Sequence, residues 1–302
     1  MQTEHTSKSA FVSIVGKANV GKSSILNNLL GSKIAIVSDK PQTTRTRIMG
    51  VLTTDDAVQL VFTDTPGYHK PHNKLGEKMM EAVSDSIAGV DCCLLVTDAS
   101  ERELNEAELA LLQKIRAEKL PTILVLNKID LVKNKEDLIP KMAALQKLYA
   151  FEEIIPVSAK NGNGMQELLN EIKNRAQESV HFFPDDTLTD QPERVLAAEM
   201  IREKMLRLLD REVPHGIAVA IEQMHEREDK PILDIEATIY CERESHKGIV
   251  IGKKGQMLKK ISTYARQDME RFFDCKVNLQ CWVKVKEGWR NREGLIHNFG
   301  LD

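Results

Sequence analysis

Short apolar runs rich in β-branched residues recur through the first half of the chain and alternate with amphipathic segments. The runs predict strands over Phe11–Val15, Val58–Thr63, Cys92–Asp98, Thr122–Leu126 and Ile154–Val157. The spacing between them predicts helices over Ser23–Leu30, Leu104–Glu118, Lys135–Leu148 and Met165–Gln177. Because strands that alternate with helices need crossover connections, we predict an α/β domain over residues 11–178, with a mostly parallel sheet covered on both faces. A polar segment, residues 1–10, precedes it.

The pattern changes after Gln177. Residues 179–192 show little periodicity and are interpreted as a linker. Over residues 193–302 the spacing predicts a smaller α+β domain with the order helix, strand, strand, helix, helix, strand. The longer elements are expected at Pro192–Asp210, Ile217–Glu226, Ile232–Cys241, Gln256–Phe272 and Lys276–Lys284, with a tail helix near Asn291–His297.

Basic residues concentrate near the C-terminus, although the whole chain has a net charge of -3. Residues 243–292 carry 13 Lys or Arg against 5 Asp or Glu, a balance of +8, which leaves -11 for the remainder. Such a patch on an otherwise acidic chain favours a polyanionic partner, while a solvated charged face would have the same composition.

The cysteines and the hydropathy bear on the compartment. The five cysteines form no C-x-x-C pair with a further His or Cys set, so neither a disulfide framework nor a zinc site is indicated. No apolar run approaches the roughly 18 residues that span a bilayer, and Met1–Ala10 is polar and unlike a signal peptide. We expect a cytoplasmic protein with at most peripheral membrane contact.

A phosphate-binding loop is predicted at Gly16-x-x-x-x-Gly21-Lys22-Ser23, between a strand and a helix. Its glycines let backbone N–H groups and the helix N-terminus point at phosphates. Lys22 is expected on the β- and γ-phosphates and Ser23 on Mg²⁺. Taken alone, the motif could also be a chance glycine-rich turn. The predicted contacts are Gly16, Lys17, Ala18, Asn19, Val20, Gly21, Lys22, Ser23 and Ser24.

Three later motifs predict a guanine nucleotide. In Asp64-Thr65-Pro66-Gly67, Asp64 is expected to hold Mg²⁺ through water and the Gly67 N–H to contact the γ-phosphate. Asp130 would accept hydrogen bonds from guanine N1–H and the 2-amino group, which adenine lacks. The other predicted base contacts are the amide of Asn127 on the base edge, Lys128 over the ring, and the loop Ser158, Ala159 and Lys160, with the Ala159 N–H facing O6.

The polar stretch Pro41-Gln42-Thr43-Thr44-Arg45 predicts the first switch segment. One threonine should close over Mg²⁺ when the γ-phosphate is present, and Thr44 is preferred over Thr43, although both could be ordinary loop threonines. The predicted metal ligands are therefore Ser23, Thr44 and Asp64. The predicted catalytic residues are Asn19, Lys22, Thr44 and Gly67.

Tyr68 occupies the position where many GTPases place a glutamine that orients the attacking water. Tyrosine does not replace glutamine in the same way, so slow intrinsic hydrolysis is expected. Asn19 is suited to hold a K⁺ ion whose charge would stabilise the transition state as an arginine finger does. A hydrogen bond that stabilises the loop is the alternative role for Asn19.

A second glycine loop, Gly252-Lys253-Lys254-Gly255, follows two predicted strands and joins two helices, as in a KH domain. Such a loop clamps the backbone of about four nucleotides, and bases would lie on a groove formed by Ile249, Val250 and Ile251. G-x-x-G also joins ordinary helices. The predicted RNA contacts are Lys247, Ile249, Ile251, Gly252, Lys253, Lys254 and Gly255. Trp282 is assigned to the core, with base stacking by Trp282 or Trp289 as the alternative.

With these motifs in this order, the chain resembles the bacterial Era family of GTPases throughout its length. The resemblance implies a P-loop GTPase domain joined to a type II KH domain, with Mg²⁺ and GTP or GDP bound. It implies a slow, monomeric GTPase that acts in small ribosomal subunit assembly and binds single-stranded sequence near the 3′ end of the small-subunit rRNA. Some members associate peripherally with the inner membrane.

Two other function classes stay open from the sequence. A binding protein could use GTP only as a structural ligand. A metabolic P-loop phosphotransferase would need an acceptor substrate and would have no use for Asn127–Asp130.

Overall fold

The computed structural model describes residues 7–301, and the chain divides into two compact units. The first comprises Met1–Val37, Thr44–Lys70 and Met79–Asp190, and the second comprises Ser38–Thr43, Pro71–Lys78 and Gln191–Asp302. Two short segments from within the predicted first domain thus group with the second unit. No helix of residues 7–301 is long and apolar enough to span a bilayer.

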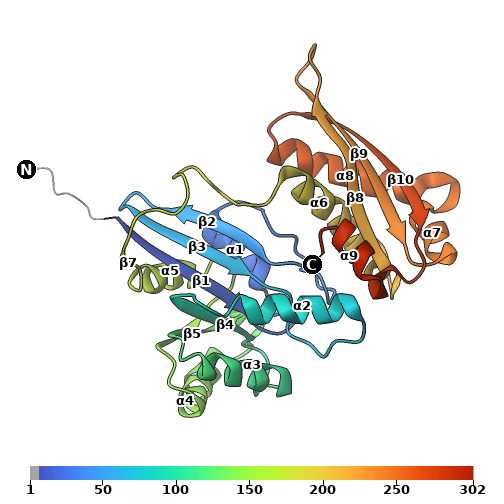
Figure 1. The fold of residues 1–302 in the computed structure, drawn as a ribbon. Helices are drawn as coiled ribbons and strands as arrows, with labels where there is room; N and C mark the ends of the chain where they lie inside the picture. The colour runs from blue at the N-terminus through green and yellow to red at the C-terminus, as the bar shows by residue number, and fades with distance from the viewer. Residues whose placement is uncertain (1–6, 302) are drawn as a thin grey trace, which may run out of the picture. The chain divides into compact units, whose positions relative to one another are not determined.

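The first unit is built on a seven-stranded sheet (Figure 1). The strand order is β2-β3-β1-β4-β5-β6, with parallel pairing from β3 through β6 and antiparallel pairing of β2 with β3. A short strand, β7, pairs with the start of β1, before the pairing of β1 with β4 begins. The strands are β1 (Lys8–Val15), β2 (Ile48–Thr53), β3 (Val58–Asp64), β4 (Cys92–Asp98), β5 (Thr122–Asn127), β6 (Glu153–Pro156) and β7 (Gln177–Glu178).

Helices cover both faces of this sheet. All residues of β4 and β5 are buried, as expected for parallel strands packed on two sides. The helices α2, α3 and α4 pack against one face through Val83, Leu111 and Leu145, while α1 and α5 contact each other on the other face (Figure 1). The helices are α1 (Lys22–Leu30), α2 (Lys74–Asp85), α3 (Glu106–Ala117), α4 (Leu138–Leu148) and α5 (Met165–Lys173). The predicted α/β fold is confirmed.

Several predicted boundaries differ from the structure. Part of the predicted polar segment 1–10 lies in β1, which begins at Lys8, and residues 1–6 lie outside the described part. The predicted linker 179–192 belongs to the first unit as far as Asp190. There the buried amide of Gln59 accepts hydrogen bonds from the N–H groups of Phe182 and Phe183 and donates to the Phe183 carbonyl. A side-chain clamp of this kind leaves no periodic signal in the sequence.

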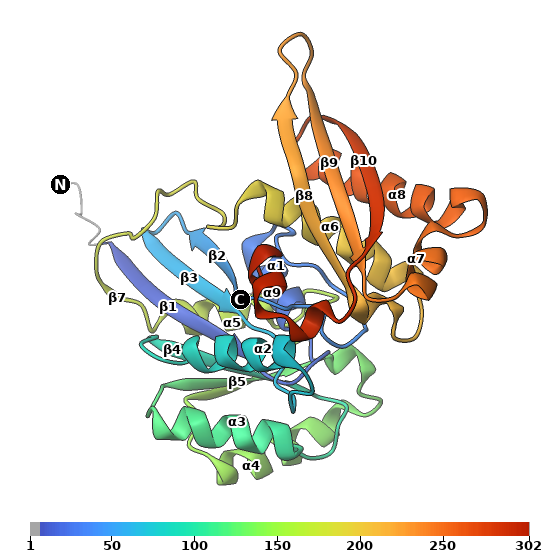
Figure 2. The same ribbon diagram turned by 45° about the vertical axis from the view of Figure 1, so that its right-hand side comes forward.

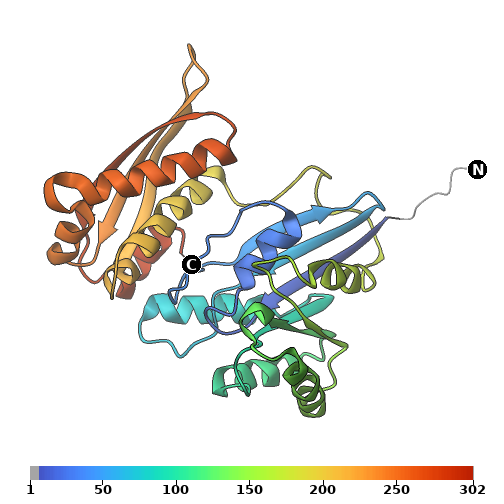
Figure 3. The same cartoon turned by 180° about the vertical axis from the view of Figure 1, so that it is seen from behind.

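The second unit has the predicted order of elements (Figure 2). Its sheet has the order β10-β9-β8, with β8 and β9 antiparallel and β9 and β10 parallel. In the view from behind, α6 and α8 lie next to each other against the sheet (Figure 3). The elements are α6 (Glu193–Leu208), β8 (Ile217–Glu226), β9 (Ile232–Cys241), α7 (Glu244–Ile251), α8 (Gln256–Phe272), β10 (Lys276–Val285) and α9 (Glu293–Asn298).

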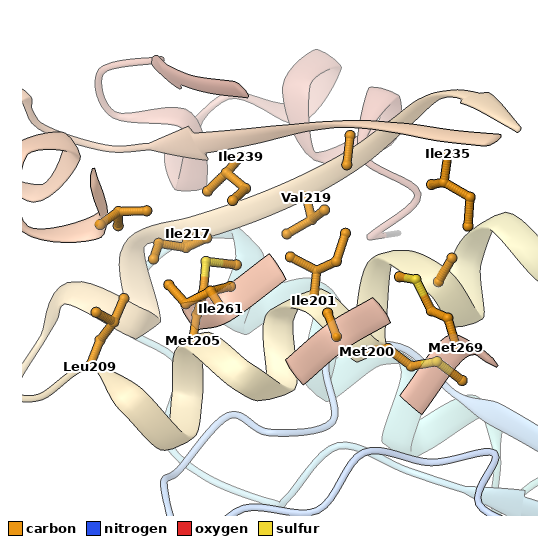
Figure 4. Packing of buried hydrophobic residues seen from close by; sticks show 14 of the residues in the cluster. Met200, Ile201, Met205, Leu209, Ile217, Val219, Ile235, Ile239, Ile261 and Met269 are labelled. Atoms are coloured by element: carbon orange, nitrogen blue, oxygen red, sulfur yellow. The ribbon is translucent and has the colours of Figure 1, made fainter. Parts of the chain in front are cut away.

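An apolar core lies between α6, α8 and this sheet (Figure 4). Met200 and Ile201 from α6 face Val219 and Ile235 from the strands, and Ile261 from α8 closes the cluster. These residues are at most 8% exposed, so the unit buries a core of its own.

The tryptophan prediction is wrong. Trp282 is 44% exposed on β10, because the alternate residues Leu279, Cys281 and Val283 of that strand face the core. Trp289 is instead fully buried, and its indole N–H donates to the Gly216 carbonyl at 3.0 Å. Burial removes Trp289 as a base-stacking residue.

Candidate nucleotide and RNA sites

The phosphate loop connects β1 to α1 and needs two of its glycines for steric reasons. Gly16 has a φ of 153°, and a Cβ there would lie 2.3 Å from the Val96 carbonyl oxygen. Gly21 has a φ of 98°, and its Cβ would lie 2.2 Å from the Asn127 side-chain nitrogen. The loop is therefore packed directly against the end of β4 and against the predicted base-binding residue Asn127.

The side chain of Lys22 lies inside this loop. It is 6% exposed, and its Nζ donates to the carbonyls of Gly16 at 3.1 Å and Lys17 at 3.0 Å. Burial lowers the pKa of Lys22 to about 8, while the charge of Asp64 opposes the shift. A partly desolvated ammonium surrounded by backbone dipoles is suited to bind phosphate oxygens.

Three oxygen atoms meet beside the loop. Ser23 Oγ donates to Asp64 Oδ2 at 2.6 Å and lies 2.9 Å from Thr44 Oγ1, which in turn lies 3.4 Å from the same carboxylate oxygen. The hydroxyl of Thr43 instead donates to the Lys40 carbonyl at 2.6 Å. The geometry therefore favours Thr44 over Thr43, as the sequence did.

This cluster fits Mg²⁺. The ion takes oxygen ligands and keeps several waters, and here two hydroxyls and one carboxylate converge. Asp64 is fully buried, and its Oδ1 has no hydrogen-bond partner among the described residues. Burial raises the pKa of Asp64 to about 6, against the opposing effects of Lys22 and Ser23. An orphaned buried carboxylate oxygen is what a hydrated cation would satisfy.

The motif Asp64–Gly67 and the residue that follows it lie against the phosphate loop. The Tyr68 N–H donates to the Gly16 carbonyl at 3.1 Å, and a Cβ on Gly67 would lie 2.5 Å from Ala18 Cα. Only glycine fits here, because any side chain would separate the two loops. Asn19 has a φ of 65°, in the left-handed region that asparagine tolerates better than most residues. Its predicted K⁺ role stays a prediction.

The base-recognition residues hydrogen-bond to one another. Asn127 is buried, and its amide donates to the Val20 carbonyl at 2.8 Å and accepts from the Ala159 N–H at 3.0 Å. The Ser158 hydroxyl donates to Asp130 at 2.7 Å. Asn127 thus connects the phosphate loop to the loop Ser158–Lys160. This connecting role of Asn127 differs from the direct contact with the base that the sequence predicts. The predicted contacts of Asn127 and Ala159 with guanine stay predictions.

Sequence reasoning missed one charged residue of this site. Asp98, the last residue of β4, pairs with Lys128 at 2.8 Å. Because ligand sites of parallel sheets form at the carboxyl ends of strands, the position of Asp98 at a strand end was the available signal.

The G-K-K-G loop of the second unit connects α7 to α8. Gly252 has a φ of 70°, and a Cβ there would lie 2.7 Å from Met257 Cβ, whereas a Cβ on Gly255 would meet open space. Lys253 and Lys254 are exposed, and the loop immediately precedes the N-terminus of the long helix α8. Exposed ammonium groups beside a helix N-terminus suit a phosphate backbone.

The predicted apolar groove needs one correction. Ile249 is 49% exposed and Ile251 is partly exposed, but Val250 is fully buried in the core. One step along α7 turns the side chain by about 100°, which directs Val250 into the core, so Val250 has no surface to offer a base. Lys247 is half-buried, and its Nζ lies 3.5 Å from Glu244 Oε1.

Comparisons with known protein families agree with this division. Residues 11–128 match a family described as 50S ribosome-binding GTPase, and residues 212–290 match the KH domain. GTPase Era of Clostridioides difficile (strain 630) is 51% identical over 98% of this chain and 99% of its own length. GTPase Era of Ruminiclostridium cellulolyticum is 48% identical over 97% of each chain.

Two solved structures have a TM-score of 0.94 with this chain. One is a tyrosine-to-alanine variant of Aquifex aeolicus Era bound to GDP·AlF4⁻, 40% identical over 97% of this chain and 99% of its own. The other is Era in complex with MgGDPNP and nucleotides 1506–1542 of 16S ribosomal RNA, 39% identical over 98% of this chain and 99% of its own.

Proposed function

Because this chain belongs to the Era family of GTPases, we propose that it is a GTP-driven switch that binds ribosomal RNA and acts in small ribosomal subunit assembly. One observation carries the proposal: the chain matches, over 98% of its length, an Era structure that contains both MgGDPNP and a 16S rRNA fragment. The RNA in question is single-stranded sequence near the 3′ end of the small-subunit rRNA.

The first unit binds and hydrolyses GTP. Lys22 and the N–H groups of the phosphate loop contact the β- and γ-phosphates, and the Gly67 N–H contacts the γ-phosphate. Ser23, Thr44 and Asp64 would hold Mg²⁺, and the bound ion would neutralise charge on the phosphate oxygens. Water attacks the γ-phosphorus, and the bond to the β–γ bridging oxygen breaks to give GDP and phosphate.

The intrinsic rate is slow because Tyr68 replaces the glutamine that would orient water. We assign Asn19, inside the phosphate loop, to a K⁺ site, where the charge of the ion would stabilise the transition state. The measurement is single-turnover hydrolysis in matched KCl and NaCl buffers. Equal rates in the two salts would remove this role of Asn19.

Guanine is selected by Asp130, whose carboxylate accepts from N1–H and the 2-amino group. The hydrogen bond from Ser158 to Asp130 supports this role, because it holds one oxygen of the carboxylate in place. Asn127 and the Ala159 N–H complete the base site, and Lys128 packs over the ring.

The second unit binds RNA through its G-K-K-G loop. Gly252 and Gly255 allow the nucleotide backbone to approach, Lys253 and Lys254 pair with phosphates, and Ile249 and Ile251 contact bases. Lys247 adds charge beside the loop. The cytoplasm is the proposed compartment, the protein is proposed to be a monomer, and peripheral contact with the inner membrane is proposed from the family.

The test is fluorescence anisotropy with a labelled single-stranded RNA that copies the 3′ end of the small-subunit rRNA, at one fixed salt concentration. Protein loaded with a GTP analogue is compared with protein loaded with GDP. Tighter binding with the analogue is expected if the nucleotide drives the switch. Equal binding in both states would mean that GTP binding and RNA binding are not coupled. No binding in either state would refute this RNA as the partner.

A further inference from the structure

The segment Asp98–Glu101 contacts both halves of the nucleotide site, although no motif includes it. It leaves the end of β4 beside β5 (Figure 1), where Asp98 lies opposite Asn127 in the strand pairing. The Ala99 N–H donates to the Asn127 carbonyl at 2.7 Å. The segment therefore starts at the sheet edge where the base site begins.

The carboxylate of Asp98 fixes the end of the Lys128 side chain. Its Oδ2 lies 2.8 Å from Lys128 Nζ, while its Oδ1 accepts from the N–H of Ser100 at 2.9 Å and from the Ser100 hydroxyl at 2.6 Å. Burial acts to raise the pKa of Asp98, but the hydrogen bonds from Lys128 and Ser100 hold the pKa below its ordinary value. Asp98 is therefore an ionised partner for the Lys128 ammonium at neutral pH.

The backbone of Lys128 is fixed as well. Its φ of 66° lies in the left-handed region, which a lysine occupies only when its surroundings require it. With the backbone and the ammonium both held, the part of the side chain that lies between them is the alkyl stem. The side chain as a whole is 31% exposed, so it is not enclosed by the protein.

The segment itself is held by Lys141 of α4. Lys141 Nζ donates to the carbonyls of Asp98 at 3.2 Å and Ala99 at 3.0 Å, and also to that of Glu101. At its far end the Glu101 carboxylate pairs with Lys17 of the phosphate loop. One anchored segment thus contacts the base-recognition loop through Asp98 and the phosphate loop through Glu101.

We infer that Asp98 is a positioning residue for guanine nucleotides, which holds the Lys128 ammonium so that the alkyl stem lies flat over the base ring. Glu101 and Lys141 set the position of Asp98 relative to the phosphate loop. The inference rests on the proposed binding of guanine at Asn127–Asp130. It assigns part of the affinity for the base to a residue outside the four motifs.

The test is a double-mutant cycle on nucleotide dissociation. Asp98→Asn keeps the size of the side chain and its ability to accept from Ser100, and Lys128→Met keeps an apolar stem without the charge. Asp98→Asn should speed the dissociation of fluorescent GDP and of a fluorescent GTP analogue by the same factor, about tenfold, since both carry the base. In the Lys128→Met background, Asp98→Asn should add less than about twofold, because the partner through which it acts is gone.

A matched control is available in the same unit. Asp56 pairs with Lys173 at 2.6 Å and accepts from the Thr54 hydroxyl at 2.6 Å, which reproduces the partner chemistry of Asp98 away from both nucleotide loops. Asp56→Asn should leave both dissociation rates unchanged. Thermal unfolding of the nucleotide-free variants separates a loss of stability from a loss of positioning.

The outcomes distinguish the inference from the proposed base site. If Lys128→Met slows or leaves unchanged the dissociation of both nucleotides, the held ammonium does not contribute to the base contact and this inference fails, while the guanine placement is tested separately by Asp130→Asn. If Lys128→Met weakens binding but Asp98→Asn does not, only the inference is overturned. Multiplicative effects of the two substitutions would also overturn it, because Asp98 would then act independently of Lys128.

Discussion

The phosphate loop of the first unit and the G-K-K-G loop of the second are both glycine-rich. They differ in whether the charged residues that would bind phosphate or its metal ion are buried or exposed. In the first, Lys22 and Asp64 are buried and already hydrogen-bonded to neighbouring protein groups. In the second, Lys253 and Lys254 are exposed. Buried partners give selectivity because an imperfect ligand leaves them unpaired. Exposed charges give affinity that depends on salt and little on geometry.

The largest expected effect comes from breaking the contact that selects the base. Asp130→Asn should convert guanine preference into xanthine preference, because an amide can donate to the carbonyl that xanthine has in place of the 2-amino group. Two hydrogen bonds to a charged group, at about 1.5–3 kcal/mol each, correspond to a shift on the order of 10²–10⁴-fold in relative affinity. Competition between GDP and XDP for a fluorescent nucleotide measures it. Unchanged preference would exclude Asp130 from base selection.

The RNA loop should respond differently, with a smaller loss that depends on salt. Lys253→Asp combined with Lys254→Asp should weaken RNA binding by about 100-fold at low salt. The slope of log affinity against log salt concentration should become shallower by about 0.7 for each lost phosphate contact. GTP affinity should not change. Lys133→Asp with Lys135→Asp makes the same charge change at exposed sites of the first unit and should leave both properties intact. Retained RNA affinity in the loop variant would refute the clamp.

The buried carboxylate makes the first unit sensitive to pH near its raised pKa. Mg²⁺ binds ionised Asp64, and with a pKa of about 6 most of this carboxyl is protonated at pH 5. Mg²⁺ affinity should therefore fall about tenfold between pH 7 and pH 5. Titration of Mg²⁺ against GDP-bound protein at both pH values measures it, and Asp64→Asn should bind weakly at both.

Unfolding does not explain such a loss. A carboxyl whose pKa is raised from 3.8 to about 6 in the folded protein takes up its proton more readily there than in the unfolded chain. Its contribution to stability is therefore present below pH 4 and is lost as the pH rises through 6, so acid favours the folded state at this residue. A pH-independent Mg²⁺ affinity would show that Asp64 stays ionised.

The difference between buried and exposed elements also decided which strands and helices could be predicted from the sequence. Strands such as β4, which is buried on both faces, appear as unbroken apolar runs and were found. The antiparallel edge strand β2 was missed, because Gly50 interrupts its pattern where Leu30 of α1 packs against it; a Cβ there would lie 2.6 Å from Leu30 Cδ1. The helix α2 was missed too, although it is amphipathic, because its first turn follows a polar, proline-containing segment.

The motifs of the site were predictable because each is short and local. The sequence favoured Thr44 over Thr43 without excluding either, and the position of the Thr44 hydroxyl 2.9 Å from Ser23 Oγ supports that choice. Asp98 was missed because its partner, Lys128, is 30 residues away in the chain, and strand pairing alone brings the two together. The buried state of Trp289 has the same origin, since Gly216 is distant in the sequence.

The two tryptophans of the second unit allow the same comparison of a buried with an exposed residue, with the smallest expected effects. Trp289→Phe removes the indole N–H that pairs with the Gly216 carbonyl and leaves that buried acceptor unpaired, which should destabilise the protein by about 1–3 kcal/mol. Trp282→Phe, at an exposed position of β10, should cost less than about 0.5 kcal/mol. Urea unfolding followed by circular dichroism compares the two. A larger loss for Trp282→Phe would mean that the exposed face of β10 packs against something that the intramolecular contacts do not include.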